Sequence, residues 1–324
     1  MDLFLSSIQS RADDVFIAFA TAITFQIVTI VISLLTKRTI LPLPIIEHCI
    51  RPTAITLIDK LNREGRSDFA LIIRGSIVFT VLFILILGAG IIIEAFLIYT
   101  SNAAFMGSIL LFLALSPLSF VLPVLGISSD KTRAGQYRTI AQALNQNLVT
   151  TDKHGLRRAS YKTLAVGLSQ WVIGPILFYL LGGLILTYLY VTLSIFTRVT
   201  SQRHKIFLSL YGIIYKIMNI LVSVVSVLFV GVGACFSAGG KPLSIFNAFK
   251  DTSNMIESAL AHTQNITLGG AGQDRHGHPI STSWFGAENA TAKLDHNDVL
   301  RGVIQYCITI FLIGVVLFAL WGFR

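Results

Sequence analysis

Charged side chains are scarce in this chain of 324 residues, and acidic ones are the scarcest. Asp and Glu number 16 against 25 Lys and Arg, so that 13% of the residues are charged and 54% are hydrophobic. Soluble domains carry about 25% charged residues. The composition therefore excludes an ordinary soluble domain and indicates an integral membrane protein.

Cysteine is almost absent as well. Cys49, Cys235 and Cys307 lie far apart, and no disulfide framework or zinc site can be built from that spacing. We expect them to be small buried apolar side chains. No secretory signal peptide is predicted, because residues 1–14 contain a single cation, Arg11.

The formal net charge of +9 does not predict nucleic-acid binding. The Lys and Arg residues stand in blocks between apolar stretches, as they do in cytoplasmic loops and near anionic lipid headgroups. A nucleic-acid interface requires a basic face or a known motif instead. We therefore expect the lipid bilayer as a partner and no nucleic acid.

Apolar stretches of about twenty residues predict the membrane helices. They cover roughly residues 15–35, 77–98, 107–126, 171–196, 207–234 and 303–321. Pro117 and Pro123 are expected to kink the third of these helices. The chain is thus predicted to be an all-α integral membrane protein with five or six membrane helices, forming a single domain over residues 1–324.

The positions of the cations predict the topology. Residues 37–74 and 128–170 hold more than half of all Lys and Arg, so both segments are expected in the cytoplasm. Short amphipathic helices are predicted within them. One starts at Pro52, where proline in a first turn sacrifices no hydrogen bond. Another ends near Leu148, and a third begins near Leu156.

Residues 171–196 allow two arrangements. They can form one crossing helix, or two half-length helices folded back at Gly182-Gly183. A crossing puts Arg198, Arg203 and Lys205 outside, against the trend for cations, whereas a re-entrant hairpin keeps them in the cytoplasm. If residues 171–196 cross the membrane, the chain has six crossings and the polar segment 237–300 lies in the cytoplasm. If they form a hairpin, the chain has five crossings and this segment lies outside.

Several short motifs follow one another in a distinctive order. The first group is Arg158-Ala159, Leu164-Ala165, Pro175, Gly182-Gly183 and Thr192-Leu193. The second group is Asn254, the run Glu-Ser-Ala-Leu-Ala at 257–261, Leu268-Gly269-Gly270 and Trp284-Phe285-Gly286. In this order the chain resembles the CobD/CbiB cobalamin-biosynthesis proteins, and also AmpE, a related membrane protein linked to β-lactamase regulation.

The resemblance implies an adenosylcobinamide-phosphate synthase type of activity in the bacterial inner (cytoplasmic) membrane. Such proteins join an aminopropanol or its phosphate to a corrin carboxylate in an ATP-dependent, amide-forming step. ATP and magnesium would be cofactors if that activity is retained, and a corrinoid would be the substrate. The residues implied in binding substrate or phosphate are Arg157, Arg158, Arg203, Lys205, Asn254, Glu257, Gly269 and Gly270.

The chain departs from the family where the family has acids or an amide. The residues at those positions are Lys162, Val166, Gly167, Gln170 and Ser194. Since Mg²⁺ needs oxygen ligands, usually anionic, the sequence supports two hypotheses. In the first hypothesis, the protein is an amide-forming ligase or supports the amide-forming step. In the second, it is a non-catalytic, AmpE-like protein that acts in signalling or interacts with other membrane proteins. A transporter is a third hypothesis, although no inverted repeat is visible.

Apart from what the resemblance implies for Gly269 and Gly270, two further motifs do not by themselves predict a site, and no catalytic residue or metal site is predicted. The glycine-rich residues 268–272 are expected to be a flexible turn, because no Lys-Ser/Thr pair follows them as in a phosphate-binding loop. Residues 275–278 (Arg-His-Gly-His) are expected to be a solvated loop and not a metal site.

Overall fold

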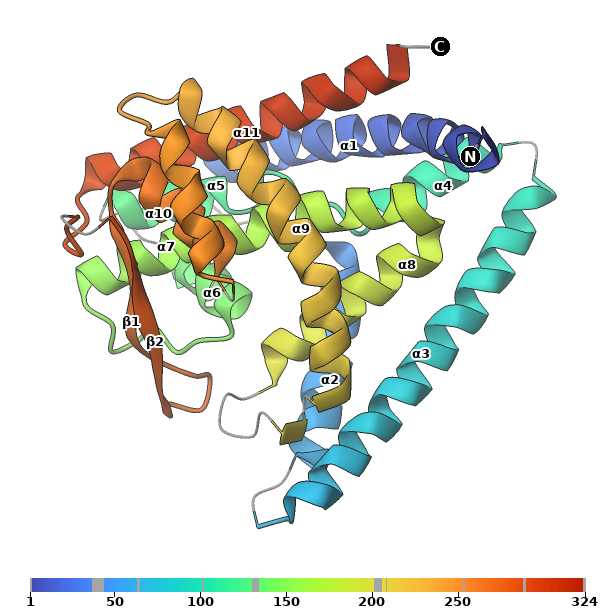
Figure 1. Cartoon of the computed structure of the whole chain (residues 1–324), viewed down its shortest axis with the longest axis horizontal. Coiled ribbons are helices and arrows are strands. Elements are labelled where there is room, and N and C mark those ends of the chain that lie inside the picture. Colours follow the sequence, from blue (N-terminus) through green and yellow to red (C-terminus); the bar gives the residue numbers. More distant parts are fainter. Residues whose placement is uncertain are drawn as a thin grey trace.

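The computed structural model describes residues 2–36, 44–62, 65–100, 102–129, 134–200, 206–207, 209–252, 254–287 and 290–322. Its helices are α1 (Asp2–Thr36), α2 (Ile45–Leu61), α3 (Asp68–Ile98), α4 (Ala103–Phe112), α5 (Val121–Ser128), α6 (Ala134–Leu144), α7 (Lys153–Leu168), the π-helical η1 (Ser169–Ile173), α8 (Gly174–Val199), α9 (Ser209–Cys235), the 3-10 helix η3 (Pro242–Lys250), α10 (Met255–Gln264) and α11 (His296–Gly322). The strands β1 (Thr267–Gln273) and β2 (Pro279–Gly286) form one antiparallel hairpin. The all-α prediction is confirmed (Figure 1).

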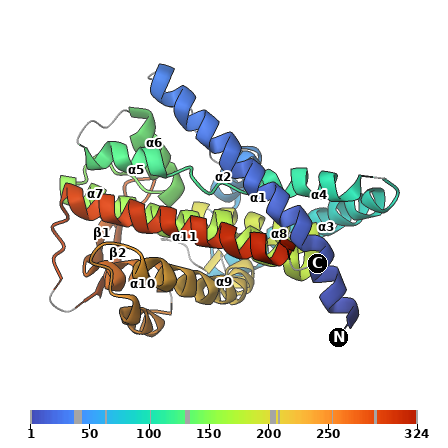
Figure 2. The ribbon, with the colours of Figure 1, turned by 90° about the horizontal axis from the view of Figure 1, so that it is seen from above.

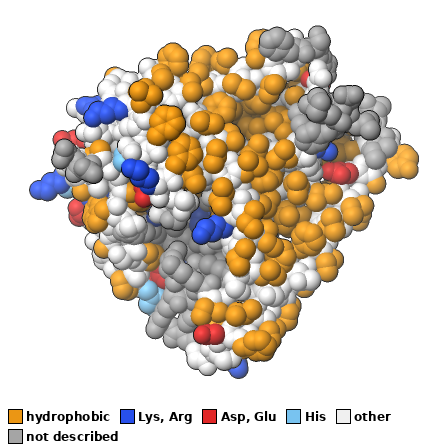
Figure 3. Space-filling view, in the orientation of Figure 1, with side chains coloured by type: hydrophobic (Ala, Val, Ile, Leu, Met, Phe, Trp, Pro, Cys, Tyr) orange, Lys and Arg blue, Asp and Glu red, His pale blue; other side chains and the backbone are white. Residues whose placement is uncertain are grey.

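Within the described residues, five helical segments are long and apolar enough to cross a membrane. They are residues 11–36 of α1, 68–97 of α3, the continuous segment 153–199, α9 and α11. The most apolar window of α3 is only 11% buried, with a mean hydropathy of 2.9. In Figure 3 apolar side chains cover much of the right of the molecule, where α3 lies, and most charged ones lie on the left. The protein is therefore a multi-pass membrane protein in contact with lipid.

Residues 171–196 fold back on themselves as a helical hairpin, which is the geometry that the re-entrant arrangement requires. The chain reverses at Gly182-Gly183 (Figure 1), where Gly183 has φ +67° and ψ −155°, a conformation that essentially only glycine adopts. The two arms pack face to face, with the rings of Phe178 and Tyr190 4.9 Å apart. The fold-back brings the guanidinium of Arg198 to 5.2 Å from the ring centroid of Trp171.

The predicted helix over residues 107–126 is interrupted around Pro117, where the sequence predicted only a kink. The chain leaves the helix at Leu113 and re-enters it only at Val121, around Pro117. Distant side chains satisfy the freed backbone groups: Tyr306 Oη donates to the Pro117 carbonyl at 2.6 Å, and Gln26 Oε1 accepts from the Leu118 amide. Such internal partners are what a break within the apolar region requires.

Four smaller predictions also need correction. Helix α2 begins at Ile45, so Pro52 lies inside the helix and not in its first turn. The thiols of Cys49 and Cys235 are on exposed residues, and only Cys307 is partly buried. The glycine-rich residues 268–272 belong to strand β1, with a register shift at Gly269, where φ is +108°. The helix expected to end at Leu148 ends at Leu144.

The polar segment 237–300 packs against the cation-rich segment 134–158. The Asn147 amide donates to the Gln273 carbonyl at 3.1 Å, and Arg158 Nη1 donates to the Ala292 carbonyl at 2.8 Å. Both segments therefore lie at one end of the molecule. From the sequence, a hairpin at residues 171–196 was instead expected to put these two segments on opposite sides of the membrane. That argument took α9 as a simple crossing, whereas α9 runs at a steep angle to α1 and α11 (Figures 1 and 2).

Candidate functional site

A polar cavity of about 560 Å³ lies where α7, the returning arm of α8, α9, α10 and the β1–β2 hairpin meet. The end of α6 completes its wall. A smaller space of about 60 Å³ adjoins it and shares Gln146, Lys162, Glu257 and Ile280 with it. The main cavity is within the range of about 300–1,000 Å³ that is typical of small-molecule sites.

Helical spacing places the polar side chains on the cavity wall. On α7 and η1, Lys162, Val166 and Gln170 lie four residues apart and so share one face. On α9, Tyr215 and Asn219 repeat the same step. Gln170 Nε2 donates to Tyr215 Oη at 2.9 Å, which joins the two helices across the cavity floor.

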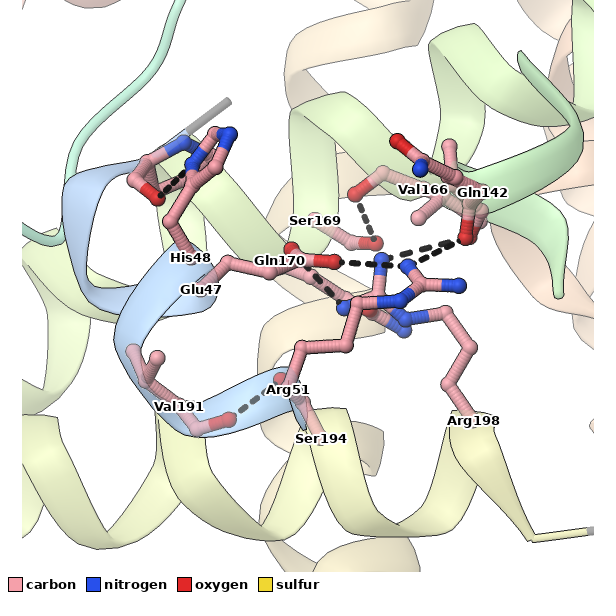
Figure 4. A network of polar contacts seen from close by, with 12 residues as sticks. Glu47, His48, Arg51, Gln142, Val166, Ser169, Gln170, Val191, Ser194 and Arg198 are labelled. Carbon is pink, nitrogen blue, oxygen red and sulfur yellow. Dashed lines mark hydrogen bonds and ion pairs between the residues drawn. The ribbon is translucent and has the colours of Figure 1, made fainter. Parts of the chain in front are cut away.

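An ion-pair cluster built on Glu47 fixes the position of Arg198 (Figure 4). Glu47 is 1% exposed; its carboxylate receives Arg51 Nη1 at 3.1 Å and Arg198 Nη2 at 3.0 Å. Arg198 Nη1 also donates to the Ala143 carbonyl at 3.2 Å, and its guanidinium stacks over Trp171. The side chain of Arg198 is thus held rigidly at the wall of the cavity.

This cluster is not electrically neutral, because two guanidinium groups share one carboxylate. The side chain of Arg198 is 7% exposed, and its Nε has no hydrogen-bond partner among the described residues. A buried charge that is incompletely paired is costly. The arrangement therefore leaves net positive charge and an unused donor at the cavity.

Unpaired buried polar atoms gather at this cavity. Within the described part of the chain, the lining residues Asn145, Gln170, Thr197 and Arg198 each carry a buried nitrogen or oxygen without a partner. Buried polar groups in proteins are almost always hydrogen-bonded. The wall is therefore suited to a ligand that carries negative charge and also offers hydrogen-bond donors to amide and hydroxyl oxygens.

Lys162 and Glu257 stand between the main cavity and the smaller one. Burial raises the pKa of the Glu257 carboxyl above its ordinary value, and the nearby charge of Lys162 opposes that rise. The two groups form no ion pair among the described residues. Lys162 is accordingly a second cation that a ligand in the cavity can meet.

The acids at the cavity do not make a metal centre. Asp274, the other acid on the wall, accepts hydrogen bonds at 2.9 Å from the amides of His276 and His278, which places its carboxylate in the turn of the hairpin. Among the described residues no group of three or more His, Cys, Asp or Glu side chains could hold a metal ion. The donor set here therefore does not fit a protein-built Mg²⁺ site.

The structure brings together most of the predicted site residues. Asn254 and Glu257 line the main cavity, whereas Arg158, Gly269 and Gly270 line the smaller one.

Arg157, the remaining predicted cation that the structure describes, does not join them. Arg157 lines neither cavity: it is 5% exposed and its Nη1 donates to the Leu294 carbonyl at 2.9 Å, so it fastens α7 to the segment before α11. Its predicted role as a ligand-binding residue is therefore not supported. Arg203 and Lys205 lie outside the described residues.

The sequence did not predict two parts of the cavity wall, namely Arg198 with its partner Glu47 and the polar residues of α9. Arg198 was considered only as a marker of topology, and no role was predicted for its partner Glu47. The repeat Tyr215, Asn219, Ser223 at intervals of four is a polar stripe in an apolar helix, and it could have indicated an interior face. All three line the cavity.

The cavity also contains most of the positions at which the chain lacks the acids and amide of the proteins it resembles. Lys162, Val166, Gln170 and Ser194 all line it. Gly167 faces away, toward Phe120. Comparison of the chain with protein-family models, with curated proteins and with solved structures gives no match.

Proposed function

We propose that this membrane protein binds a small molecule carrying a carboxylate or phosphate in the polar cavity. We further propose that the ligand is a corrinoid or its aminopropanol-derived partner, as in the CobD/CbiB proteins that the sequence resembles. The protein would then act in cobalamin biosynthesis, in a bacterial inner membrane. The observation that carries the proposal is the buried, incompletely paired guanidinium of Arg198 at the cavity wall.

The charges of the wall support an anionic ligand. Arg198 and Lys162 can each donate to a carboxylate or phosphate oxygen, and hydrogen bonds to charged groups are the stronger class. The buried amide oxygens of Asn145 and Gln170, which have no partner among the described residues, belong to side chains of the same wall. An anionic ligand pairs with the cations of the wall, whereas an apolar ligand does not.

The sequence resemblance and the cavity point to the same wall, which supports the corrinoid assignment. The resemblance assigns acidic site residues to the positions of Lys162, Val166 and Ser194, and these side chains line one space. In this chain the same wall is basic or neutral. We therefore assign it to holding the corrin carboxylate or the phosphate, in support of the amide-forming step.

Growth complementation tests this role in cells. The wild-type chain and Lys162→Gln would be expressed in a strain that lacks the amide-forming step, with membrane insertion checked by immunoblot of the membrane fraction. We expect growth with the wild-type chain and loss of growth with Lys162→Gln. Failure of the inserted wild-type chain to support growth would remove the cobalamin assignment, but it would leave anion binding by the cavity untouched.

A second candidate function is a non-catalytic, AmpE-like role in signalling or interaction with other membrane proteins. The observation that favours it is the replacement of expected acids by Lys162 and Ser194 at the cavity. Purified protein in nanodiscs would be assayed for phosphate release from ATP, with and without a corrinoid. Turnover that saturates with the corrinoid and is lost in Lys162→Gln would contradict this candidate, and so would complementation, because a strain that lacks the amide-forming step grows only if the expressed chain catalyses it.

A further inference from the structure

A second cavity, apolar and of about 400 Å³, lies between α2, α3 and the returning arm of α8. We call it the apolar groove. Helix α2 separates it from the charged cluster, because Ile46, Ile50 and Thr53 line the groove while Glu47 and Arg51 belong to the cluster. The other walls come from α3 and α8.

The groove offers nothing to a charged occupant, and its few polar lining groups are the side chains of Cys49, Thr53, Tyr188 and Thr192. Its lining has no Asp, Glu, Lys, Arg or His. The hydroxyl of Tyr188, which lines it, already donates to the Leu110 carbonyl at 2.9 Å. Apolar cavities of this kind exclude water and take apolar ligands, so we infer that the occupant is a hydrocarbon.

The groove opens onto the surface that faces the lipid. Leu85 lines the groove and is nevertheless 62% exposed. Next to it, Ile84 and Ile92 are 60% and 71% exposed. Because α3 is the least buried of the candidate spans, the rim of the groove is continuous with the bilayer-facing surface.

Two close contacts hold α3 against the rest of the protein. At the start of α3, Gly75 lies so near Phe207 that an added Cβ would be 2.1 Å from its carbonyl oxygen. Farther along, Gly90 meets Ile185 in the same way, at 2.4 Å. Most of the lining residues of α3 fall between these contacts, and Figure 1 shows α3 running along the edge of the molecule.

We propose that the apolar groove holds one acyl chain of a bilayer phospholipid. The open lipid-facing rim supplies the chain directly from the membrane, and the volume falls within the range of about 300–1,000 Å³ for bound small molecules. The chain lies against α2, whose opposite side holds Glu47 and through it Arg198. This proposal does not rest on the function proposed for the polar cavity.

Photo-crosslinking in nanodiscs tests the proposal. The probe is a phosphatidylethanolamine with a diazirine in one acyl chain, and labelled peptides are mapped by mass spectrometry. The variant Ala89→Trp fills the groove from an exposed lining position of α3. Ala95→Trp is the matched control, because Ala95 is exposed on the same helix and does not line the groove.

We expect the wild-type protein and Ala95→Trp to be labelled on α2 at residues 46–53, and Ala89→Trp to lose that label. Labelling of the outer face of α3 near Ile84 should persist in all three and serves as the internal standard. If Ala89→Trp does not fold, Thr53→Trp fills the groove from the α2 wall. Absence of label on α2 in the wild-type protein, or equal label in the filled variant, would overturn the proposal.

Discussion

Replacing Glu47 by glutamine should destabilise the protein more than removing either of its arginine partners. The carboxylate is 1% exposed and lies 3.1 Å from Arg51 and 3.0 Å from Arg198. Glu47→Gln removes both attractions and leaves two buried guanidinium groups facing each other. Arg198→Met instead removes one attraction together with the repulsion between the arginines, and it leaves the Glu47–Arg51 pair neutral.

The magnitudes follow from these geometries. At an effective dielectric constant of about 20, two unit charges about 4 Å apart interact by about 4 kcal/mol. Breaking a buried pair by removing one partner typically costs about 3–5 kcal/mol, which we expect for Glu47→Gln. For Arg198→Met we expect about 1–3 kcal/mol, from the lost stacking on Trp171 and the lost hydrogen bond to Ala143.

The assay is equilibrium unfolding of the purified protein in mild detergent, for the two single variants and the double variant. Because Glu47→Gln leaves Arg198 unneutralised, adding Arg198→Met should then cost less stability than it does in the wild-type protein. The double variant is therefore expected to be less destabilised than the sum of the singles by about 1–3 kcal/mol. Strict additivity, or a Glu47→Gln variant no less stable than Arg198→Met, would refute the reasoning.

Three further predictions concern the acid at the cavity, the hairpin and the topology. Burial raises the pKa of Glu257, so the folded state loses stability as the pH rises above the ordinary value of 4.5. Glu257→Gln should therefore raise the melting temperature near neutral pH and flatten its pH dependence. An unchanged pH profile would contradict this reasoning. Gly183→Ala should cost about 1–3 kcal/mol in denaturant titrations because φ is positive there, whereas Gly182→Ala, with φ −151°, should cost less. Single cysteines at Thr150 and Ser281, in a cysteine-free background, should react with an impermeant maleimide from the same side of the membrane; opposite sides would contradict the packing of the hairpin on residues 146–147.

Much of the helical architecture could be predicted from the sequence, because long apolar runs have few alternatives in a membrane protein. The reversal at Gly182-Gly183 was visible as one of two possibilities. The sequence predicted a kink at Pro117 but not a full break of the helix, because the freed backbone groups are satisfied by Gln26 and Tyr306, which are distant in the sequence. The direction of α9 also cannot be read from its apolarity, since hydropathy measures length and not orientation.

The candidate site, like the fold, could be predicted from the sequence only in part. Asn254 and Glu257 were predicted from a local motif, and they line the cavity. The role of Arg198 was missed because it depends on Glu47, 151 residues away. A cation after an apolar helix ordinarily indicates a cytoplasmic loop. Only the fold-back of α8 turns this one into a buried residue at the wall of a cavity.

The most direct test of anion binding by the cavity is equilibrium dialysis of paired corrinoids with the protein in nanodiscs. One corrinoid carries a single free carboxylate, and in the other that carboxylate is an amide. Lys162→Gln is the variant, and Lys216→Gln, an exposed cation of α9 that does not line the cavity, is the control.

Since a hydrogen bond to a charged group contributes about 1.5–3 kcal/mol, the wild-type protein and Lys216→Gln should bind the free carboxylate at least about tenfold more tightly than the amide. Lys162→Gln should lose most of that preference. Equal affinity of the wild-type protein for both corrinoids, or an unchanged preference in Lys162→Gln, would contradict the account.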